Sequence, residues 1–325
     1  MSVGFWYQSR MELIWILYNI IALICILIVA IPLIIRGVLF LHVFLISRIF
    51  YKKKDFTKCF GEWAVVTGGS DGIGKNFAIE LAKRKVNVVL ISNVQEDLKK
   101  VANEIECNFG VKTRTIVADF SLGEEEYQRI ESEIKDLSIG ILVNNVGIGL
   151  GLPNKFEDMT RQEMWNMLRI NVCAAVSMAH FLLPSMKTNG KGLIVNIASA
   201  SALLPAPYVN LYGASKAFIK SFSEALRYEC RKTGVKVQTL CPCFVNTRIC
   251  SESNARKQLK LLFPTPEKFV KSAVATIGVA STTTGYWPHE IQYIGVEMVL
   301  PKWIGMKLMM LLMNTNLRKV RKESA

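Results

Sequence analysis

A glycine-rich turn near residue 70 constrains the fold of this chain more than any other feature. It follows an apolar run at residues 63–66 and precedes a helix-like segment at residues 75–82. Its residues are Thr67, Gly68, Gly69, Ser70, Asp71, Gly72, Ile73 and Gly74. Glycines let a backbone approach a pyrophosphate, whose charge then meets free N–H groups at the positive end of the helix dipole. A glycine turn also serves simple close packing, so it predicts dinucleotide binding only together with further signals.

Beyond this turn, apolar runs of strand length alternate with longer helical patterns. The expected strands cover residues 64–67, 86–91, 115–117, 139–143, 193–197 and 235–240. Such alternation builds a parallel sheet with helices on both faces. We therefore expect an α/β fold with a doubly wound, Rossmann-like parallel sheet. A length of 325 residues suits one catalytic domain of about 250 residues with extensions.

The N-terminal region is apolar enough to anchor the chain in a membrane. Residues 13–35 contain no charge, which makes 23 positions in a row, and a helix needs about 20 to cross a bilayer. A second apolar run at residues 37–47 follows Arg36, which leaves open one tilted helix, a hairpin, or a span with an interfacial helix. A cleaved signal peptide is disfavoured, because the apolar core is too long and no small-residue cleavage site stands out.

Positive charge after the apolar run predicts the orientation of the chain. Arg36, Arg48 and three lysines at residues 52–54 follow the run. Only Arg10 and Glu12 lie near its start. The catalytic domain should therefore face the cytoplasm. The eight cysteines are scattered, several of them within apolar stretches, and we expect them to be reduced core residues.

Neither a metal site nor nucleic-acid binding is expected. Cys241 and Cys243 are too closely spaced for a zinc knuckle, and the three histidines lie far away in sequence. The net charge of +14 is not accompanied by a nucleic-acid motif. Basic residues at 52–54 and 318–322 adjoin apolar segments, which suits an anionic membrane surface or, for the tail, mere solvation.

The ends of the second and third expected strands bear on the choice of cofactor. Asn93 stands where an acidic residue would bind the ribose 2′-hydroxyl of NAD and repel the 2′-phosphate of NADP. Lys75, just after the glycine turn, offers a positive charge to that phosphate. We therefore favour NADPH/NADP over NAD. Asp119 follows the third strand and is expected to contact the adenine amino group or to cap a turn.

A serine, a tyrosine and a lysine follow at a spacing that suits proton transfer. Tyr212 comes thirteen positions after Ser199, and Lys216 comes four positions later at the start of a helical pattern. The phenol and the ammonium therefore lie on one helix face, one turn apart. A nearby cation favours the phenolate and prepares a tyrosine for acid–base work. Residues 144–147 follow the fourth strand, at the edge where ligands bind in open sheets.

The ordered set of motifs resembles that of the short-chain dehydrogenase/reductase family. The resemblance covers residues 60–300 approximately and rests on the glycine turn, residues 144–147, Asn171, Ser199, Tyr212-x-x-x-Lys216 and Pro242-x-x-Val245-x-Thr247. It implies that Tyr212 protonates a carbonyl oxygen as hydride arrives and that Ser199 orients the carbonyl. It also implies that Lys216 binds the nicotinamide ribose and stabilises the Tyr212 phenolate, and that Asn171 holds a water of the proton relay. Val245 and Thr247 would hold the nicotinamide carboxamide.

Two sets of site residues follow from the motifs and the resemblance together. The cofactor is expected to contact Gly68, Ser70, Asp71, Gly72, Ile73, Gly74, Lys75, Asn93, Asp119, Asn145, Val146, Gly147, Tyr212, Lys216, Val245 and Thr247. The catalytic residues are expected to be Asn171, Ser199, Tyr212 and Lys216.

More narrowly, residues 61–67, 71–75, 140–147 and 284–289 look like one branch of the family. That branch contains the type 3 and type 12 17β-hydroxysteroid dehydrogenases, the latter also called very-long-chain 3-oxoacyl-CoA reductase, and the hydroxysteroid dehydrogenase-like proteins. Its members are bound to the endoplasmic reticulum membrane. This sequence departs from the pattern at Asn93, where the branch often has an arginine for NADP, and at Cys243, where a glycine is common. Some hydroxysteroid dehydrogenase-like members lack the catalytic tyrosine, whereas Tyr212 is present here.

The resemblance and the sequence pattern together predict three parts. Residues 1–55 form a membrane anchor and basic linker, residues 56–293 form the catalytic domain with a lid near 248–266, and residues 294–325 form an apolar membrane-associating segment with a basic tail. We expect NADPH-dependent reduction of a ketone on a hydrophobic lipid, with the catalytic domain at the cytoplasmic face of the endoplasmic reticulum.

The lid bears on the choice of substrate. Four basic lid residues could meet the phosphates of CoA: Arg248, Arg256, Lys257 and Lys260. They favour a very-long-chain 3-oxoacyl-CoA over a steroid, which has no anion for them to bind. A catalytically weak, cofactor-binding scaffold at the membrane is the alternative of another class. A homodimer is a candidate assembly.

Overall fold

The computed structural model describes residues 2–46, 49, 55–149, 155–203, 205, 207–247, 261–299, 301, 303–307 and 310–311. Three expected features lie outside these residues. They are the basic linker with Arg48 and residues 52–54, the four basic lid residues Arg248, Arg256, Lys257 and Lys260, and the basic tail at residues 318–322.

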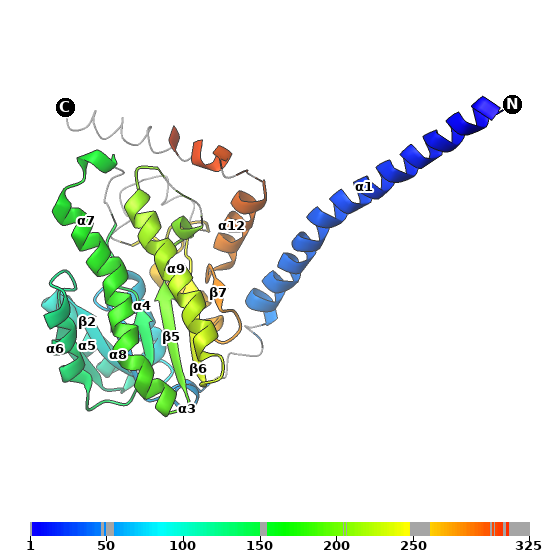
Figure 1. The fold of residues 1–325 in the computed structure, drawn as a ribbon. Coiled ribbons are helices and arrows are strands. Elements are labelled where there is room, and N and C mark those ends of the chain that lie inside the picture. Colours follow the sequence, from blue (N-terminus) through cyan, green and yellow to red (C-terminus); the bar gives the residue numbers. More distant parts are fainter. Residues whose placement is uncertain are drawn as a thin grey trace.

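The expected doubly wound α/β fold is confirmed (Figure 1). The strands run parallel in the order β3-β2-β1-β4-β5-β6-β7. Their bounds are β1 Trp63–Thr67, β2 Asn87–Ser92, β3 Thr113–Val117, β4 Ile139–Asn144, β5 Gly192–Ile197, β6 Val235–Leu240 and β7 Thr282–Thr283. The six expected strands are all present. The seventh strand, β7, was not expected, because two threonines make no apolar run that a sequence pattern would reveal.

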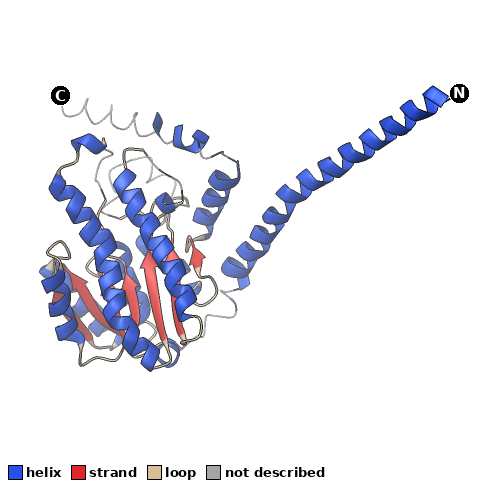
Figure 2. Ribbon diagram, in the orientation of Figure 1, coloured by secondary structure: helices blue, strands red, loops and turns tan. Residues whose placement is uncertain are grey.

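Helices cover both faces of the sheet (Figure 2). Helices α4 (Gly72–Ala82), α5 (Gln95–Phe109) and α11 (Pro266–Ala275) pack on one face, and α6 (Glu124–Ile134), α8 (Ala174–Thr188) and α9 (Asn210–Cys230) pack on the other. Among the described residues, the domain also contains helices α3 (Phe56–Cys59), α7 (Arg161–Leu168) and α12 (Trp287–Val299). Short helical turns lie at η2 (Phe156–Asp158), η3 (Arg169–Cys173) and η4 (Ala200–Ala202).

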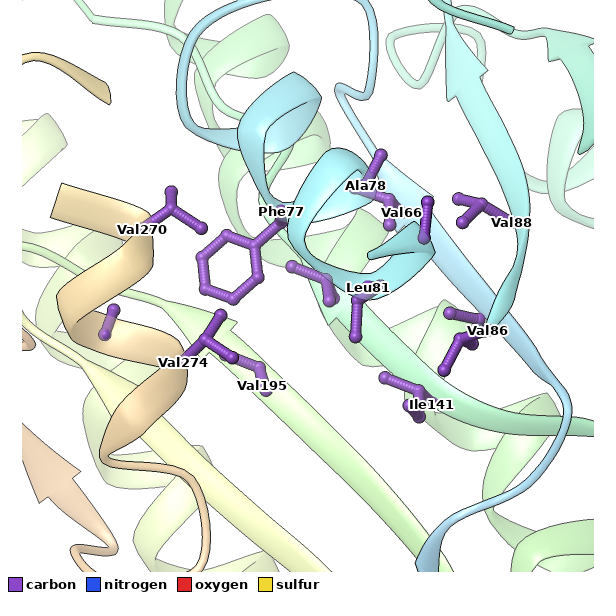
Figure 3. Packing of buried hydrophobic residues seen from close by; sticks show 14 of the residues in the cluster. Val66, Phe77, Ala78, Leu81, Val86, Val88, Ile141, Val195, Val270 and Val274 are labelled. Carbon is purple, nitrogen blue, oxygen red and sulfur yellow. The ribbon is translucent and has the colours of Figure 1, made fainter. Parts of the chain in front are cut away.

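Each face of the sheet has its own apolar core. On the face of α4, the ring of Phe77 is fully buried and lies between Val270 and Val274 of α11 (Figure 3). Burial of such a side chain contributes about 1.5–3 kcal/mol. This packing fixes α4 against the sheet, and α4 begins at the glycine turn. The core of one face therefore positions the candidate phosphate cradle.

The N-terminal segment forms one long helix, α1 (Ser2–Leu41), which continues into a π-helical turn, η1 (His42–Ile46). Residues 37–46 prolong the same helix, so the described residues form no hairpin. The stretch Arg10–Ile46 has 37 residues and a mean hydropathy of 2.9. At 1.5 Å per residue it is about 55 Å long, which exceeds the hydrocarbon core of a bilayer. The helix points away from the domain with its apolar side chains exposed, which makes it a candidate anchor (Figure 1).

A second stretch, Arg161–Thr188, is also long and apolar enough to span a membrane. It belongs to the domain, where Met178 of α8 is fully buried against the sheet. We therefore assign it to the core.

The expectation that the cysteines are core residues is only partly correct. Cys230 and Cys241 are buried, whereas Cys59, Cys107 and Cys173 are exposed. All the cysteines that the structure describes are free thiols. The exposed ones lie on the outer sides of helices or at helix ends, a difference that an apolar sequence context does not reveal.

Two glycines bring the chain before β1 into contact with the start of β4. Gly61 has a φ of +138°, and a Cβ on Gly140 would lie 2.0 Å from Phe60 O and 2.6 Å from Gly61 Cα. The pairing of β1 with β4 shifts register here, because Trp63 faces Ile139 whereas Ala64 faces Ile141. Gly140 is thus the extra residue of a bulge that needs the absence of a side chain.

We expect Gly140→Ala to destabilise the domain by about 1–3 kcal/mol, because the added methyl group overlaps backbone atoms that cannot move aside. Chemical denaturation in detergent measures the change. Gly295→Ala is the matched control, since Gly295 lies in α12 with no atom within 4 Å of the added carbon. Equal stability of the two variants would contradict this account of the bulge.

Candidate active site

A cavity of about 320 Å³ lies at the carboxyl ends of the strands. In a doubly wound sheet this is the edge where ligands bind. Most of the expected site residues line it: Gly68, Ser70, Asp71, Gly72, Ile73, Asn93, Asp119, Asn145, Val146, Gly147, Ser199, Tyr212, Lys216, Val245 and Thr247. Three do not, namely Gly74, Lys75 and Asn171.

The glycine turn forms one wall of the cavity. Gly68 and Gly72 have φ angles of +64° and +56°, a region that residues with a side chain rarely adopt. Gly74 serves packing instead, because a Cβ there would lie 2.1 Å from Gly68 O and 2.5 Å from Asn145 Nδ2. The turn leads directly into α4, and Gly72 and Ile73, whose N–H groups have no acceptor within the helix, line the cavity.

Thr67 and Asn145 join the ends of β1 and β4. The hydroxyl of Thr67 accepts hydrogen bonds from the backbone N–H groups of Asn145 and Val146, each at 3.0 Å, and donates to Val143 O at 3.3 Å. In return, Asn145 Nδ2 donates to Thr67 O at 3.0 Å and to Gly68 O at 3.2 Å. These bonds hold the glycine turn against the end of β4.

Tyr212 and Lys216 project from the first turns of α9 toward the same cavity. The ammonium of Lys216 lies 5.9 Å from the centre of the Tyr212 ring and donates to Ile197 O at 3.1 Å. Lys216 is buried, and burial lowers its pKa to about 8. An ammonium has three N–H donors. Among the described residues only Ile197 O accepts from it, so its remaining donors suit ribose hydroxyls.

The buried amide of Asn171 lies behind the cavity wall, on the π-helical turn η3. Its oxygen accepts from Ile148 N at 2.8 Å, and its nitrogen donates to Ile148 O at 2.9 Å and to Ser215 Oγ at 3.2 Å. Ser215 donates in turn to Tyr212 O at 2.7 Å. Asn171 is thus connected through Ser215 to α9, the helix that carries Tyr212 and Lys216. A π-helical turn inside a helix often marks a functional position.

Gly147 lets these groups converge. A Cβ on Gly147 would lie 3.2 Å from Lys216 Nζ and 3.3 Å from Asn171 Oδ1. Ser199 lines the cavity nearby, and its hydroxyl accepts from Ser201 N at 3.1 Å. Three of the four expected catalytic residues, Ser199, Tyr212 and Lys216, therefore line the cavity, and Asn171 lies behind its wall.

The opposite end of the cavity corrects one expectation. Lys75 points away from it, and its ammonium pairs with Glu104 on α5 at 2.8 Å. Sequence spacing placed Lys75 beside the turn but could not show that helix α5 presents a carboxylate to it. Asn93 lines the cavity as expected, next to Ser92, whose hydroxyl lies 2.8 Å from that of Ser70. Ser70, Ser92 and Asn93 therefore offer hydroxyls and an amide, and the lining also includes the carboxylates of Asp71 and Asp119.

Asp119 lines the cavity and also caps a turn. Its carboxylate accepts from Ser121 N at 2.9 Å. The two interpretations offered by the sequence are therefore compatible.

Ten lining residues were not expected from the sequence: Ser92, Ala118, Phe120, Ile148, Gly149, Ile170, Ile197, Ala198, Pro242 and Cys243. Most directly follow or end a strand, or adjoin a motif residue. A rule that took the two residues after every strand would have found several of them. Ile170 does not follow a strand, because it lies on the helical turn η3, and its one signal is that it adjoins Asn171.

Comparison with known proteins gives this geometry a family context. Residues 62–258 match the family model described as short chain dehydrogenase. Hydroxysteroid dehydrogenase-like protein 1 of Gallus gallus is 45% identical over 250 residues, which cover 77% of this chain and 75% of that protein. Inactive hydroxysteroid dehydrogenase-like protein 1 of Homo sapiens is 42% identical, covering 78% and 76%. Very-long-chain 3-oxoacyl-CoA reductase of Rattus norvegicus is 43% identical over 268 residues, covering 81% and 84%.

Solved structures with the same fold include complexes with both nicotinamide cofactors. A 7β-hydroxysteroid dehydrogenase structure has a TM-score of 0.73 at 23% identity and covers 79% of this chain and 99% of its own, a likeness of fold alone. A short-chain dehydrogenase from Sphingobium yanoikuyae with NADPH has a TM-score of 0.62 at 26% identity, covering 68% and 86%. A 3-ketoacyl-(acyl-carrier-protein) reductase from Brucella melitensis with NADH has a TM-score of 0.61 at 26% identity, covering 69% and 96%.

The position of Lys75 leads to a first prediction for the site. Lys75→Ala should change the dissociation constant of NADPH by less than about twofold, because its charge is already neutralised by Glu104. Asn93→Asp should weaken NADPH about tenfold relative to NADH, since like charges close to one another cost about 1–4 kcal/mol. Fluorescence titration with both cofactors measures these ratios. A large loss in the Lys75 variant alone would return that lysine to the cofactor site.

The low pKa of Lys216 leads to a second prediction. An anionic cofactor favours the charged ammonium form of Lys216 over its neutral amine form. At a pH where Lys216 is deprotonated in the cofactor-free protein, cofactor binding therefore takes up a proton. The affinity for NADPH should therefore fall as pH rises above about 8, by up to about tenfold per unit. Titrations between pH 7 and pH 9.5 test this. Lys216→Met should bind more weakly and lack the slope, and a slope that persists in this variant would assign the titration to another group.

Proposed function

This chain belongs to the short-chain dehydrogenase family and is an oxidoreductase of the type that acts on alcohol and ketone groups with a nicotinamide cofactor, and we propose that it is a membrane-bound, NADPH-dependent reductase of ketones on large lipids. One observation carries the proposal. Ser199, Tyr212 and Lys216 line the same cavity as the glycine turn, so a carbonyl held at the first three would meet a cofactor whose phosphates rest on the turn.

The proposed reaction divides the work among these side chains. NADPH, when bound, supplies the hydride to the carbonyl carbon. The Ser199 hydroxyl orients the carbonyl by donating to its oxygen, and the Tyr212 phenol gives that oxygen its proton. Lys216 stabilises the resulting phenolate and holds the ribose. Asn171 fixes the turn of chain at Ile148 and, through Ser215, the start of α9.

The remaining expected contacts complete the proposed cofactor site. Val245 and Thr247, in the loop after β6, would hold the nicotinamide carboxamide, and Asp119 would contact the adenine. We propose NADPH over NADH because Asn93 places no carboxylate at the second strand and the hydroxyls of Ser70 and Ser92 can donate to a 2′-phosphate. Lys75 no longer supports this preference, since it pairs with Glu104.

For the substrate, we propose a very-long-chain 3-oxoacyl-CoA. The rat relative that carries this activity in its name supports the choice, as do the basic side chains in the sequence of the lid. A 17β-hydroxysteroid dehydrogenase activity is the second candidate, and the name of the chicken relative favours it. The acyl chain of the first candidate and the ring system of the second are apolar, and we expect both substrates to reach the enzyme from a membrane.

We propose that α1 anchors the enzyme in the endoplasmic reticulum membrane with the catalytic domain in the cytoplasm. The length and exposed apolar surface of α1 support the anchor, and the basic residues that follow it support the orientation.

Replacement of the proposed proton donor tests the reaction. Tyr212→Phe should lower kcat for ketone reduction at least about 100-fold, because a positioned acid contributes roughly 10²–10⁴-fold. The dissociation constant of NADPH should change little, since the ring and Lys216 remain. Undiminished turnover in this variant would remove Tyr212 from the mechanism. Wild-type protein that binds NADPH but reduces no ketone lipid would favour the scaffold instead, as the relatives named inactive suggest.

The substrate proposal is tested by comparing kcat/KM for a 3-oxoacyl-CoA and a 17-oxosteroid. Neutralising Arg248, Arg256, Lys257 and Lys260 together should reduce turnover of the acyl-CoA and spare the steroid. Neutralising Lys135, Lys187, Lys191 and Lys232 gives a variant with the same loss of charge away from the cavity lining. Efficient steroid turnover with negligible acyl-CoA reduction would reverse the order of the two candidates.

A further inference from the structure

His289 is a buried histidine whose ring contacts backbone atoms on two different segments of the chain. It lies on α12 with no exposed surface. Its Nδ1 is 3.3 Å from Cys243 N, and its Nε2 is 3.2 Å from Leu262 O. A backbone N–H only donates and a carbonyl oxygen only accepts, so Nδ1 carries the lone pair and Nε2 carries the proton. Burial lowers the pKa of His289 to about 4, which keeps the ring in this neutral form at neutral pH.

The two partners belong to segments that lie side by side. Asn246 N donates to Pro264 O at 3.0 Å, and the rings of Phe244 and Phe263 lie 6.0 Å apart. The segment at residues 241–247 follows β6, and the segment at residues 261–265 leads into α11. His289 therefore adds a side-chain bridge to an existing contact between them.

The ring of His289 is itself held in place by the core. It lies 5.2 Å from the ring of Tyr286, edge to face, and 6.0 Å from the ring of Phe269. Phe269 is fully buried between α11 and the sheet. The imidazole is thus packed between core side chains, and its hydrogen bonds tie the backbone of the loop to that core.

The loop needs such support because residues 241–247 have no regular secondary structure. Cys243, Val245 and Thr247 nevertheless line the cavity. Thr247 also faces the glycine turn, since its Cγ2 lies 3.2 Å from the position of a Cβ on Gly72. A small displacement of this loop would therefore change the width of the cavity between the turn and Thr247.

We propose that His289 is a positioning residue: its Nδ1 accepts from Cys243 N and so holds the cavity wall formed by Cys243, Val245 and Thr247 in the geometry that accepts the nicotinamide end of the cofactor, while its bond to Leu262 O keeps the ring in the tautomer that can accept. The cofactor part of this proposal rests on the proposed function. The bridge itself does not, so its effect on the loop is measurable without any cofactor.

Three substitutions separate the two bonds of the ring. His289→Asn places an amide oxygen near the position of Nδ1 and can still accept from Cys243 N. His289→Gln places an amide nitrogen near Nε2 and can still donate to Leu262 O. His289→Phe keeps the aromatic packing on Tyr286 and Phe269 and loses both bonds. Gln238→Leu is the matched control, because buried Gln238 on β6 makes three hydrogen bonds to Thr276 and Ala280, outside the cavity lining.

Alkylation of Cys243 by iodoacetamide, followed by peptide mass spectrometry, reports on the loop without cofactor. Cys243 is half-buried, and burial raises its thiol pKa to about 11, so local opening of the loop should speed its reaction. We expect about tenfold faster alkylation in His289→Phe and His289→Gln, and near wild-type rates in His289→Asn, since a lost buried hydrogen bond shifts a local equilibrium by about that factor. Buried Cys230 reports global unfolding and should stay protected.

Fluorescence titration with NADPH gives the second readout. The dissociation constant should rise about tenfold in the Phe and Gln variants and by less than about threefold in the Asn variant. Gln238→Leu should lower the melting temperature without changing either readout. Alkylation of Cys243 at the wild-type rate in the Phe and Gln variants would overturn the proposal. Alkylation of Cys243 in Gln238→Leu at the fast rate expected for His289→Phe would overturn it as well.

The two proposals fail in different ways. If the alkylation pattern appears but wild-type protein binds no NADPH, the bridge stands and the proposed function falls. If NADPH binding is normal in every variant and Cys243 is unchanged, the proposed function stands and the bridge falls. Should the Phe variant not fold, the contrast between the Asn and Gln variants decides the matter alone.

Discussion

The reciprocal hydrogen bonds between Thr67 and Asn145 are the interaction on which the rest of the site depends. Strands β1 and β4 are neighbours at the centre of the sheet, and the chain leaves them toward opposite faces, to α4 and to α8. A crevice opens where the chain divides in this way. Thr67 and Asn145 close the base of that crevice through both side chains and backbone. They fix the distance between the glycine turn, which follows β1, and Gly147, which follows β4.

The part of the cavity lined by Tyr212 and Lys216 depends on a second constraint, the burial of an amine. The ammonium of Lys216 donates to Ile197 O, and the absence of a side chain at Gly147 leaves room for it. A chain of buried polar groups secures the helix that carries it, since Asn144 donates to Asn196, Asn196 to Ser223, and Ser223 to Ile219 O. Burial of this ammonium costs folding free energy, which stability alone would not favour. The network of buried hydrogen bonds supports the helix that carries Lys216.

Much of the fold could be predicted from the sequence because its signals are local. Apolar runs such as residues 193–197 form strands wherever they are buried on both faces, and Tyr212 and Lys216 lie on one helix face by virtue of spacing alone. Predictions that depended on a distant partner were less secure. Lys75 is adjacent to the turn in sequence, yet its ammonium pairs with Glu104, and Cys59, Cys107 and Cys173 are exposed although we expected the cysteines in the core.

The sequence by itself determined the order of six of the strands and the helices between them, the presence of an apolar N-terminal segment long enough to cross a membrane, and the residue types at each strand end. Only the tertiary structure decided which of these ends meet. Asn171 acts through Ile148 and Ser215, and His289 reaches Cys243 from 46 residues away along the chain. The reason is physical. A side chain's type limits which bonds it can make, but the partner it finds is set by the packing of whole helices on the sheet, which places groups from remote segments within hydrogen-bonding distance.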